Sequence, residues 1–323
     1  MLVPFDPSSS ALGSEGVTGL NLRGLAQNPN MDVLWNQDYK AGMNGIPFVK
    51  MHGLGNDFVV FDGRRDPAVL DLDDMTAARI ADRKLGVGCD QLIVIEPARD
   101  DLADAFMRIR NNDGGEVEAC GNATRCVANI VMGELGRKDV IIETVVGLLD
   151  ANGLADGRVT VDMGQVKLDW RDIPLSEAVD TNHIPLSLGP LSDAVGVNVG
   201  NPHAVFFVDD AEAIDIEKFG PILEHHEMFP ERANIEVCSI IGENQIRMRV
   251  WERGVGVTRA CGTGACAVGV AAARRGITGR KTEIILDGGP LTIEWLPDDH
   301  VLMTGPVATS FTGFLHSSLL GNH

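Results

Sequence analysis

Short apolar runs separated by turn-forming residues predict a chain built mainly of β-strands. Runs of this kind, bounded by Gly, Pro, Asn or Asp, are the usual signature of strands. Within the first half of the chain they occupy residues 47–51, 58–61, 91–95, 105–109, 140–142 and 159–163. Within the second half they occupy residues 204–208, 235–240, 246–251, 283–286, 291–295 and 301–304.

Helical spacing of apolar residues appears in one long segment of each half. The first segment covers residues 122–136 and ends at Gly136, a typical C-terminal stop, and the second covers about residues 262–275. Shorter helices are predicted at residues 76–84 and 214–224. Because helices do not alternate regularly with strands, we expect an α+β fold rather than a doubly wound sheet.

Two motifs recur at nearly the same offset, which indicates an internal duplication. The sequence Ala-Cys-Gly contains Cys120 and returns 141 residues later with Cys261. The dipeptide Gly-Asn that ends at Asn56 returns 145 residues later at Asn201. Each half therefore carries one cysteine directly before its long helix. We predict three segments: an N-terminal extension in loop or disordered form (residues 1–46), a first half (residues 47–163, completed by 306–318) and a second half (residues 164–305).

Length and charge narrow the class of protein. A chain of 323 residues is long enough for two domains. Its formal net charge of −19 disfavours nucleic acid as a partner, because phosphate binding needs a basic surface. The sequence has no apolar run long enough to cross a membrane, and its first residues lack the regions of a secretory signal. We therefore expect a cytoplasmic protein without a membrane partner.

Neither a metal site nor a disulfide framework is predicted from the six cysteines. The sequence has no C-x-x-C spacing and no His pair at zinc-ligand spacing, and disulfides are not expected without an export signal. Four cysteines have mainly apolar surroundings and are interpreted as buried core residues: Cys89, Cys126, Cys238 and Cys266.

Cys120 and Cys261 differ from the other cysteines because each precedes the first turn of a long helix. Backbone N–H groups and the helix dipole favour a thiolate there and bind carboxylates. A carboxylate held between two opposed helix N-termini would place its α-carbon between the two sulfurs. One thiolate would then remove the α-proton while the other thiol returns a proton to the opposite face. The alternative is that both cysteines are core residues, but apolar packing should not require a glycine after each.

Further motifs extend this pattern over most of the chain. They occupy residues 53–58 (Gly-Leu-Gly-Asn-Asp-Phe), 86–91 (Gly-Val-Gly-Cys-Asp-Gln), 110–116 (Arg-Asn-Asn-Asp-Gly-Gly-Glu), 120–122 (Cys-Gly-Asn), 200–203 (Gly-Asn-Pro-His), 252–254 (Glu-Arg-Gly) and 260–264 (Ala-Cys-Gly-Thr-Gly). With these motifs in this order, the chain closely resembles the diaminopimelate epimerase family from about residue 48 to residue 315.

The resemblance implies an isomerase that interconverts LL- and meso-diaminopimelate through two cysteines, in lysine and peptidoglycan precursor biosynthesis. It implies no pyridoxal phosphate or other cofactor. The implied fold is two pseudo-symmetric domains, each a barrel-like, mostly antiparallel sheet around a central helix, with the active site in the interdomain cleft. We expect a homodimer that binds diaminopimelate, a small molecule, and neither nucleic acid nor metal.

The resemblance also assigns roles residue by residue. Cys120 and Cys261 are the catalytic thiols, and His203 and Glu252 modulate their protonation. The substrate-binding residues are Asn56, Gln91, Asn111, Gly121, Asn122, Asn201, Asn234, Glu252, Arg253, Gly262 and Thr263. These roles are chemically consistent, because one sulfur must be protonated while the other is not. A substrate with two amino-acid centres also needs several fixed polar contacts.

Taken alone, several of these residues have a simpler interpretation. Asn56 and Asn201 follow glycine and are typical of turns, although their repetition in both halves favours function. Gln91 and Asn111 suit ordinary strand-end and turn positions equally well. Asn234 rests on the resemblance alone.

Three alternatives remain open. A proline-racemase-type enzyme uses the same two-cysteine chemistry, but a histidine is expected after its first Cys-Gly, where this chain has Asn122. A non-catalytic binding protein on the same fold is expected to have lost one of the two cysteines. A phenazine-biosynthesis-type isomerase would lack the cysteine pair.

Overall fold

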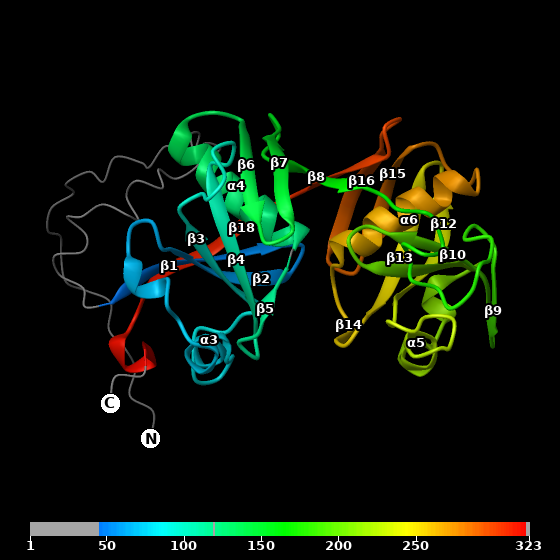
Figure 1. Ribbon diagram of the computed structural model, residues 1–323, viewed down its shortest axis with the longest axis horizontal. Coiled ribbons are helices and arrows are strands. Elements are labelled where there is room, and N and C mark those ends of the chain that lie inside the picture. The colour runs from blue at the N-terminus through cyan, green and yellow to red at the C-terminus, as the bar shows by residue number, and fades with distance from the viewer. Residues whose placement is uncertain (1–44, 119, 321–323) are drawn as a thin grey trace, which may run out of the picture.

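The computed structural model describes residues 45–118 and 120–320. These residues form two halves that lie side by side, the first coloured blue to green and the second green to orange (Figure 1). Apart from its last two residues, the extension predicted over residues 1–46 lies outside the described residues. The prediction is wrong for Ile46, which already begins a strand.

The order of the secondary-structure elements confirms the duplication. The first half contains β1 (Ile46–Gly53), β2 (Asn56–Asp62), α3 (Asp74–Ala81), β3 (Gln91–Glu96), β4 (Ala105–Asn111), β5 (Glu116–Val117), α4 (Gly121–Leu135), β6 (Asp139–Thr144), β7 (Gly147–Gly153) and β8 (Val159–Gln165). The second half repeats this order with β10 (Leu191–Asn198), β11 (Pro202–Phe207), α5 (Ile216–Glu224), β12 (Asn234–Gly242), β13 (Gln245–Glu252), β14 (Gly256–Val257), α6 (Gly262–Arg274), β15 (Lys281–Leu286), β16 (Gly289–Trp295) and β17 (His300–Gly305). The remaining elements are β9 (Ile184–Leu188), β18 (Ala308–Leu315) and the 3-10 helices η1 (Pro67–Val69), η2 (Ala211–Ala213) and η3 (Ser317–Leu320).

Strand pairing is repeated as well. In the first half β2 runs parallel to β3 and β4 parallel to β6. At the equivalent places in the second half, β11 runs parallel to β12 and β13 parallel to β15. Most of the other pairs are neighbours in sequence and run antiparallel, as expected for short connections. β18 extends the first half by pairing with β1, and β9 extends the second by pairing with β10.

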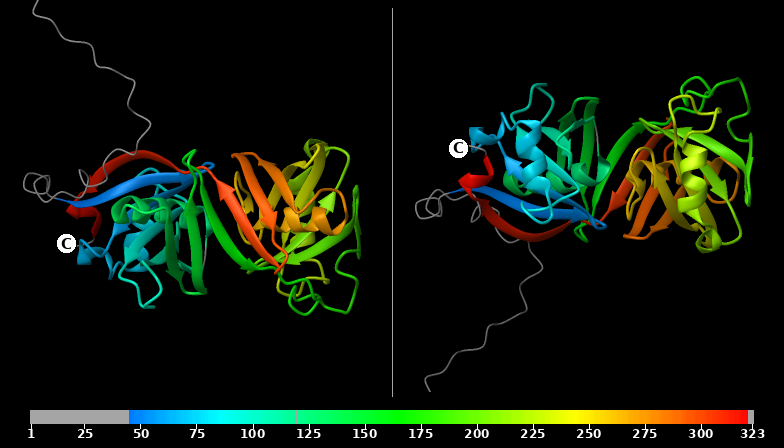
Figure 2. Two further views of the ribbon diagram at one scale, coloured as in Figure 1. Left: turned by 90° about the horizontal axis from the view of Figure 1, so that it is seen from above. Right: turned by 90° about the horizontal axis from the view of Figure 1, so that it is seen from below.

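The two halves are joined by strands that cross between them. β8 leaves the first half and pairs with β17 of the second, and the chain then returns through β18 (Figure 2). The hydroxyl groups of Thr160 and Thr304 form a hydrogen bond of 2.7 Å across the β8–β17 pair. The domain boundaries placed at residues 163 and 306 stay predictions.

Each half folds around its long helix. The buried face of α4 packs on the sheet of the first half, and α6 does the same in the second half. α3 and α5 cover separate apolar clusters on the outer sides, and both lie low in Figure 1. None of the helices in the described ranges combines the length and the apolarity that crossing a bilayer requires.

The four predicted helices are confirmed, with changes at their ends. α3 begins two residues earlier than predicted, because Asp73 caps its start by accepting the N–H of Thr76 at 2.7 Å. It ends at Ala81, before the predicted end at residue 84. Gly136 ends α4 in the left-handed conformation with φ 64°, as predicted. The prediction omits the two-residue strands β5 and β14 and also four strands that contain Gly, Pro, Ser or Asp within their length: β7, β9, β10 and β18.

Candidate active site

The two paired cysteines occupy equivalent positions at the starts of α4 and α6. Cys120 and Cys261 both have extended backbones and directly precede the first helical residue. Their predicted place at helix N-termini is therefore confirmed. The Sγ of Cys261 accepts a hydrogen bond from the N–H of Gly264 at 3.4 Å, whereas the Sγ of Cys120 lies 3.8 Å from Oδ1 of Asn56.

The N-termini of the two helices meet at the boundary between the halves. Asn122, in the first turn of α4, donates through Nδ2 to the carbonyl oxygen of Ala260 at 3.1 Å. Ala260 directly precedes Cys261. One buried side chain of the first half thus fixes the backbone that carries the cysteine of the second.

Met303 of β17 packs against both helix starts. A Cβ atom on Gly121 would lie 2.5 Å from Cε of Met303, and one on Gly262 would lie 3.0 Å from its Sδ. Close packing therefore does favour glycine after each cysteine, and the argument that packing has no need of those glycines is wrong. The case for function rests instead on two sulfurs placed at facing helix N-termini.

Polar residues of the first half surround Cys120. Oδ1 of Asn56 accepts Nδ2 of Asn122 at 3.1 Å, so these two predicted substrate-binding residues contact each other. Gln91 donates through Nε2 to Oδ1 of Asn111 at 3.1 Å. The Oε1 atom of Gln91 is buried and has no hydrogen-bond partner among the described residues, which leaves a free acceptor.

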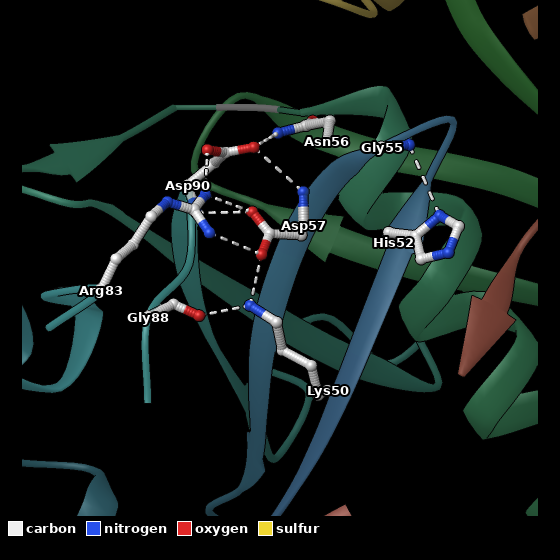
Figure 3. A network of polar contacts seen from close by, with 8 residues as sticks. All are labelled: Lys50, His52, Gly55, Asn56, Asp57, Arg83, Gly88 and Asp90. Atoms are coloured by element: carbon white, nitrogen blue, oxygen red, sulfur yellow. Dashed lines mark hydrogen bonds and ion pairs between the residues drawn. The ribbon is translucent and has the colours of Figure 1, made fainter. Parts of the chain in front are cut away.

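A charged network beneath Asn56 holds its amide in place (Figure 3). Nδ2 of Asn56 donates to Oδ2 of Asp90 at 3.2 Å. Asp57 and Asp90 each accept the backbone N–H of the other at 3.0 Å, and Arg83 bridges both carboxylates. Burial alone would raise the pKa of Asp57, but hydrogen bonds from Arg83 and Lys50 hold it well below its usual range. Asp57 therefore remains a carboxylate that anchors this corner.

The second half presents a buried histidine with two oxygen neighbours. The side chain of His203 is fully buried, with Nδ1 2.7 Å from Oε1 of Glu236 and Nε2 2.8 Å from Oδ1 of Asn201. Burial raises the pKa of Glu252, while hydrogen bonds with Thr258 and Cys261 and the charge of His203 oppose that rise. Glu252 is thus hydrogen-bonded with Cys261 and lies within electrostatic reach of His203.

Three other predicted residues lie around this group. Asn234 uses both polar atoms of its amide on the backbone: Nδ2 donates to the carbonyl of Pro202, and Oδ1 accepts the N–H of Arg253, both at 2.9 Å. The guanidinium of Arg253 belongs to an exposed residue and donates to the carbonyl of Glu231. Oγ1 of Thr263 lies 3.6 Å from Sγ of Cys261.

Burial dominates the acid–base state of both thiols. It raises the pKa of Cys120 to about 11, although backbone N–H groups at the start of α4 act in the opposite direction. Burial also raises the pKa of Cys261 well above its ordinary range, and the charges of Glu252 and Glu236 add to that rise. The N–H groups at the helix starts thus act toward the thiolate, as predicted, but burial outweighs them and leaves the pKa of both thiols raised.

Two buried charged residues near the site are missing from the sequence-based prediction. Glu236 in β12 contacts His203, and Arg125 in α4 donates through Nη2 to Oδ1 of Asn122 at 2.9 Å. Both side chains are fully buried. The available signal is a charged residue inside an otherwise apolar run, which is rare in cores unless it is paired or functional.

The sequence profile of the diaminopimelate epimerase family matches residues 48–168 and 195–310. The chain belongs to this family. A diaminopimelate epimerase of Rhodospirillum centenum is 62% identical over 273 residues, which cover 84% of this chain and 93% of that protein. A diaminopimelate epimerase of Acidiphilium cryptum is 56% identical over 274 residues, which cover 85% and 98%. The resemblance found in the motifs is confirmed.

More distant solved structures share the fold of this diaminopimelate epimerase family member. A phenazine biosynthesis protein of Bacillus anthracis aligns with a TM-score of 0.60 at 15% identity, covering 84% of this chain and 99% of that one. A hydroxyproline epimerase of Agrobacterium vitis aligns with a TM-score of 0.59 at 16% identity, covering 85% and 93%. At such identities the comparison speaks for the fold alone, and it confirms the predicted architecture.

Replacement of Asn122 tests the bridge between the helix N-termini. Asn122→Ala removes hydrogen bonds to Asn56, Ala260 and Arg125, and leaves buried partners unsatisfied. We expect the free energy of unfolding to fall by about 2–3 kcal/mol. Asn112→Ala, at an exposed position, serves as the control and should change it by no more than about 0.5 kcal/mol. Equal losses in urea denaturation of the two variants would contradict the bridge.

Proposed function

We propose that this protein interconverts LL- and meso-diaminopimelate by proton transfer at the α-carbon, with Cys120 and Cys261 as the two acid–base groups. The observation that carries the proposal is the pair of sulfurs at facing helix N-termini, tied together through Asn122 and Ala260. Relatives named diaminopimelate epimerase, at 62% and 56% identity, support the same substrate.

The reaction requires one thiolate and one thiol at the same time. The thiolate takes the α-proton, so that an S–H bond forms, the C–H bond breaks, and the electron pair stays on the α-carbon and its carboxylate. The opposite thiol then gives its proton to the other face of that carbon and becomes the thiolate. The product leaves an enzyme whose sulfurs have exchanged protonation states, and proton exchange with solvent restores them.

The helix N-termini stabilise the charge that develops during this step. α4 and α6 direct backbone N–H groups and the positive ends of their dipoles toward the place between the sulfurs. Gly121 and Gly262 begin these helices without side chains, which lets both helix starts pack closely against Met303 at the boundary between the halves. Because these donors are already oriented, they favour the carbanionic state without further rearrangement.

Polar groups of unlike chemistry recognise the rest of the substrate. The free, buried acceptor Oε1 of Gln91 suits a substrate ammonium group. The planar guanidinium of Arg253 suits a carboxylate, which it can bind through two hydrogen bonds. Asn234 holds the backbone of Arg253, and we assign it a positioning role within the substrate site. The remaining side-chain contacts come from Asn56, Asn111, Asn201 and Thr263. The set of substrate-binding residues is completed by Gly121, Asn122 and Gly262.

Glu252 and His203 adjust the protonation of the site. The negative charge of Glu252 raises the pKa of both Cys120 and Cys261, so it favours the thiol forms. Burial raises the pKa of Glu252, and the charge of His203 opposes that rise, so it acts toward the ionised form of Glu252. The pair therefore controls how easily the catalytic thiolate forms.

The other functions receive less support. A proline-racemase-type activity is disfavoured because Asn122 stands where a histidine is expected, and the named relatives at 62% and 56% identity are diaminopimelate epimerases. A binding protein or a phenazine-type isomerase is disfavoured because both cysteines are present. We also propose a cytoplasmic homodimer, and a net charge of −19 argues against nucleic acid as its partner.

Serine at either paired cysteine tests the two-base chemistry. Because a hydroxyl ionises far less readily than a thiol, Cys120→Ser and Cys261→Ser should each lower kcat by a factor of about 10² to 10⁴ or more. Cys89→Ala serves as the control and should keep wild-type turnover. Cys89 is buried in a different apolar cluster from Cys120 and Cys261. Turnover near wild type in either serine variant contradicts the proposal.

The pH dependence tests the role of Glu252. Raised thiol pKa values mean that the thiolate forms only as the pH rises, so kcat/KM of the wild type should still increase above neutral pH. Glu252→Gln removes a charge that raises both thiol pKa values. The rising limb should therefore move to lower pH, while the maximum falls because the substrate site is altered.

Glu243→Gln, at an exposed position in the β12–β13 turn, is the matched control and should leave the limb in place. A limb that moves to higher pH in Glu252→Gln, or does not move at all, contradicts this assignment of the Glu252 charge.

A further inference from the structure

The duplication allows each buried group of one half to be compared with its counterpart in the other. Strand register places Phe58 opposite Gln91 in the first half and His203 opposite Asn234 in the second. Two positions beyond Gln91 lies the apolar Ile93, whereas two positions beyond Asn234 lies Glu236. The first half therefore has two apolar residues, Phe58 and Ile93, at the positions where the second half has the titratable pair His203 and Glu236.

The long helices α4 and α6 also differ in charge, but here it is the first half that carries the charged residue. Counted from the two paired cysteines, Arg125 in α4 corresponds to Cys266 in α6. Near the paired cysteines, each half thus has a fully buried charged residue whose counterpart in the other half is uncharged. The charge is positive on the side of Cys120 and negative on the side of Cys261.

Arg125 is a buried cation without a carboxylate partner among the described residues. Its Nη2 donates to Oδ1 of Asn122 at 2.9 Å, and its Nη1 lies 3.3 Å from the thioether sulfur of Met303. Its Nε has no hydrogen-bond partner in the described ranges. A guanidinium stays protonated in proteins, and an uncompensated buried charge is strongly unfavourable. An anion that forms nearby would therefore be stabilised.

Glu236 is held just as firmly on the other side. Its Oε1 contacts Nδ1 of His203, and its Oε2 is buried without a partner in the described part of the chain. A Cβ atom on Gly264 would lie 2.9 Å from Oε1 of Glu236 and 3.2 Å from Sγ of Cys261. The carboxylate and the sulfur thus lie against the same residue, together with the side chain of Met248.

We propose that Arg125 and Glu236 are positioning residues that make the two thiols unequal, so that in the substrate-free enzyme Cys120 loses its proton at lower pH than Cys261. The proposal rests on the proposed function for its consequence, but the charge distribution itself does not depend on the substrate. Cys120 is then the sulfur that more readily takes a proton from the face of the substrate that it contacts.

The groups around each sulfur act in the required directions. Burial raises the pKa of Cys120 to about 11, and Glu252 on β13 adds to that rise, whereas the first-turn N–H groups and the positive charge of Arg125 oppose it. Glu252 and Glu236 both raise the pKa of Cys261, where only the hydroxyl of Thr263 and the N–H of Gly264 oppose them. Glu252 acts on both thiols, so the difference between them is assigned to Arg125 and Glu236.

Glu236 also fixes the orientation of His203. Both ring nitrogens of His203 lie within hydrogen-bond distance of oxygens, Oε1 of Glu236 and Oδ1 of Asn201. A carboxylate at Nδ1 favours an N–H at that nitrogen, so Glu236 helps to fix the orientation and the tautomer of the ring.

The test is site-resolved alkylation of the substrate-free full-length protein. Iodoacetamide labelling is followed over a range of pH, and peptide mass spectrometry gives one midpoint for each cysteine. In the wild type we expect the midpoint of Cys120 to lie about one pH unit or more below that of Cys261. The comparison uses midpoints rather than rates, because the two sulfurs differ in exposure.

Three variants assign the difference to the buried charges. Glu236→Gln should lower the midpoint of Cys261 by about one pH unit and leave that of Cys120 in place. Arg125→Met should raise the midpoint of Cys120 by a similar amount, and Arg125→Lys, which keeps the charge, should restore it. Glu243→Gln is the control and should change neither midpoint.

The proposal is overturned if the wild-type midpoints coincide, if that of Cys261 is the lower, or if Glu236→Gln leaves Cys261 unchanged. None of these three outcomes needs an Arg125 variant, so the result stands even if Arg125→Met fails to fold. Labelling uses no substrate, so a protein with ordered midpoints but no diaminopimelate epimerase activity would refute the proposed function alone.

Discussion

The contact between two helix N-termini is the constraint on which the rest of the structure depends. Asn122 carries it, because its amide binds Asn56 and Arg125 in its own half and the backbone of Ala260 in the other. Glycines at the first helical positions let both helix starts pack against Met303. The crossing strands β8, β17 and β18 then fix the two halves around this point. Two cysteines from distant parts of the chain are thereby held at adjoining helix starts.

Burial at this point creates the chemical problem that the surrounding charges address. Excluding water strengthens the electrostatic effect of every nearby dipole and charge, but it also raises the pKa of both thiols. A two-base reaction needs one sulfur ionised and the other protonated. A symmetric duplication would leave the two sulfurs equivalent, whereas Arg125 on one side and Glu236 on the other break that symmetry. The buried charges are therefore a functional difference between halves that otherwise repeat the same fold.

The sequence predicts the duplicated architecture and the helix starts well, because apolar spacing, terminal glycines and repeated motifs are local signals. It predicts β18 poorly, since this edge strand is largely exposed and its partner β1 lies far away in the chain. It also misses Glu236 and Arg125. Whether Glu236 faces the core depends on the register of β12 against β11. That register cannot be predicted from the pattern of residues in a single sequence. The sequence also does not predict how strongly burial raises the pKa of the two thiols, because burial is a tertiary property.

The most direct test of the two-base account is the fate of deuterium in the first turnovers of LL-diaminopimelate in D₂O. The thiol that returns the proton exchanges with solvent before substrate binds, and the thiolate on the other face takes the substrate proton away. Early meso product should therefore carry deuterium at the inverted carbon, while unreacted LL substrate keeps its protium. Protium retained in the early product, or deuterium entering the remaining substrate as fast as product forms, would show that one base serves both faces and would contradict the account.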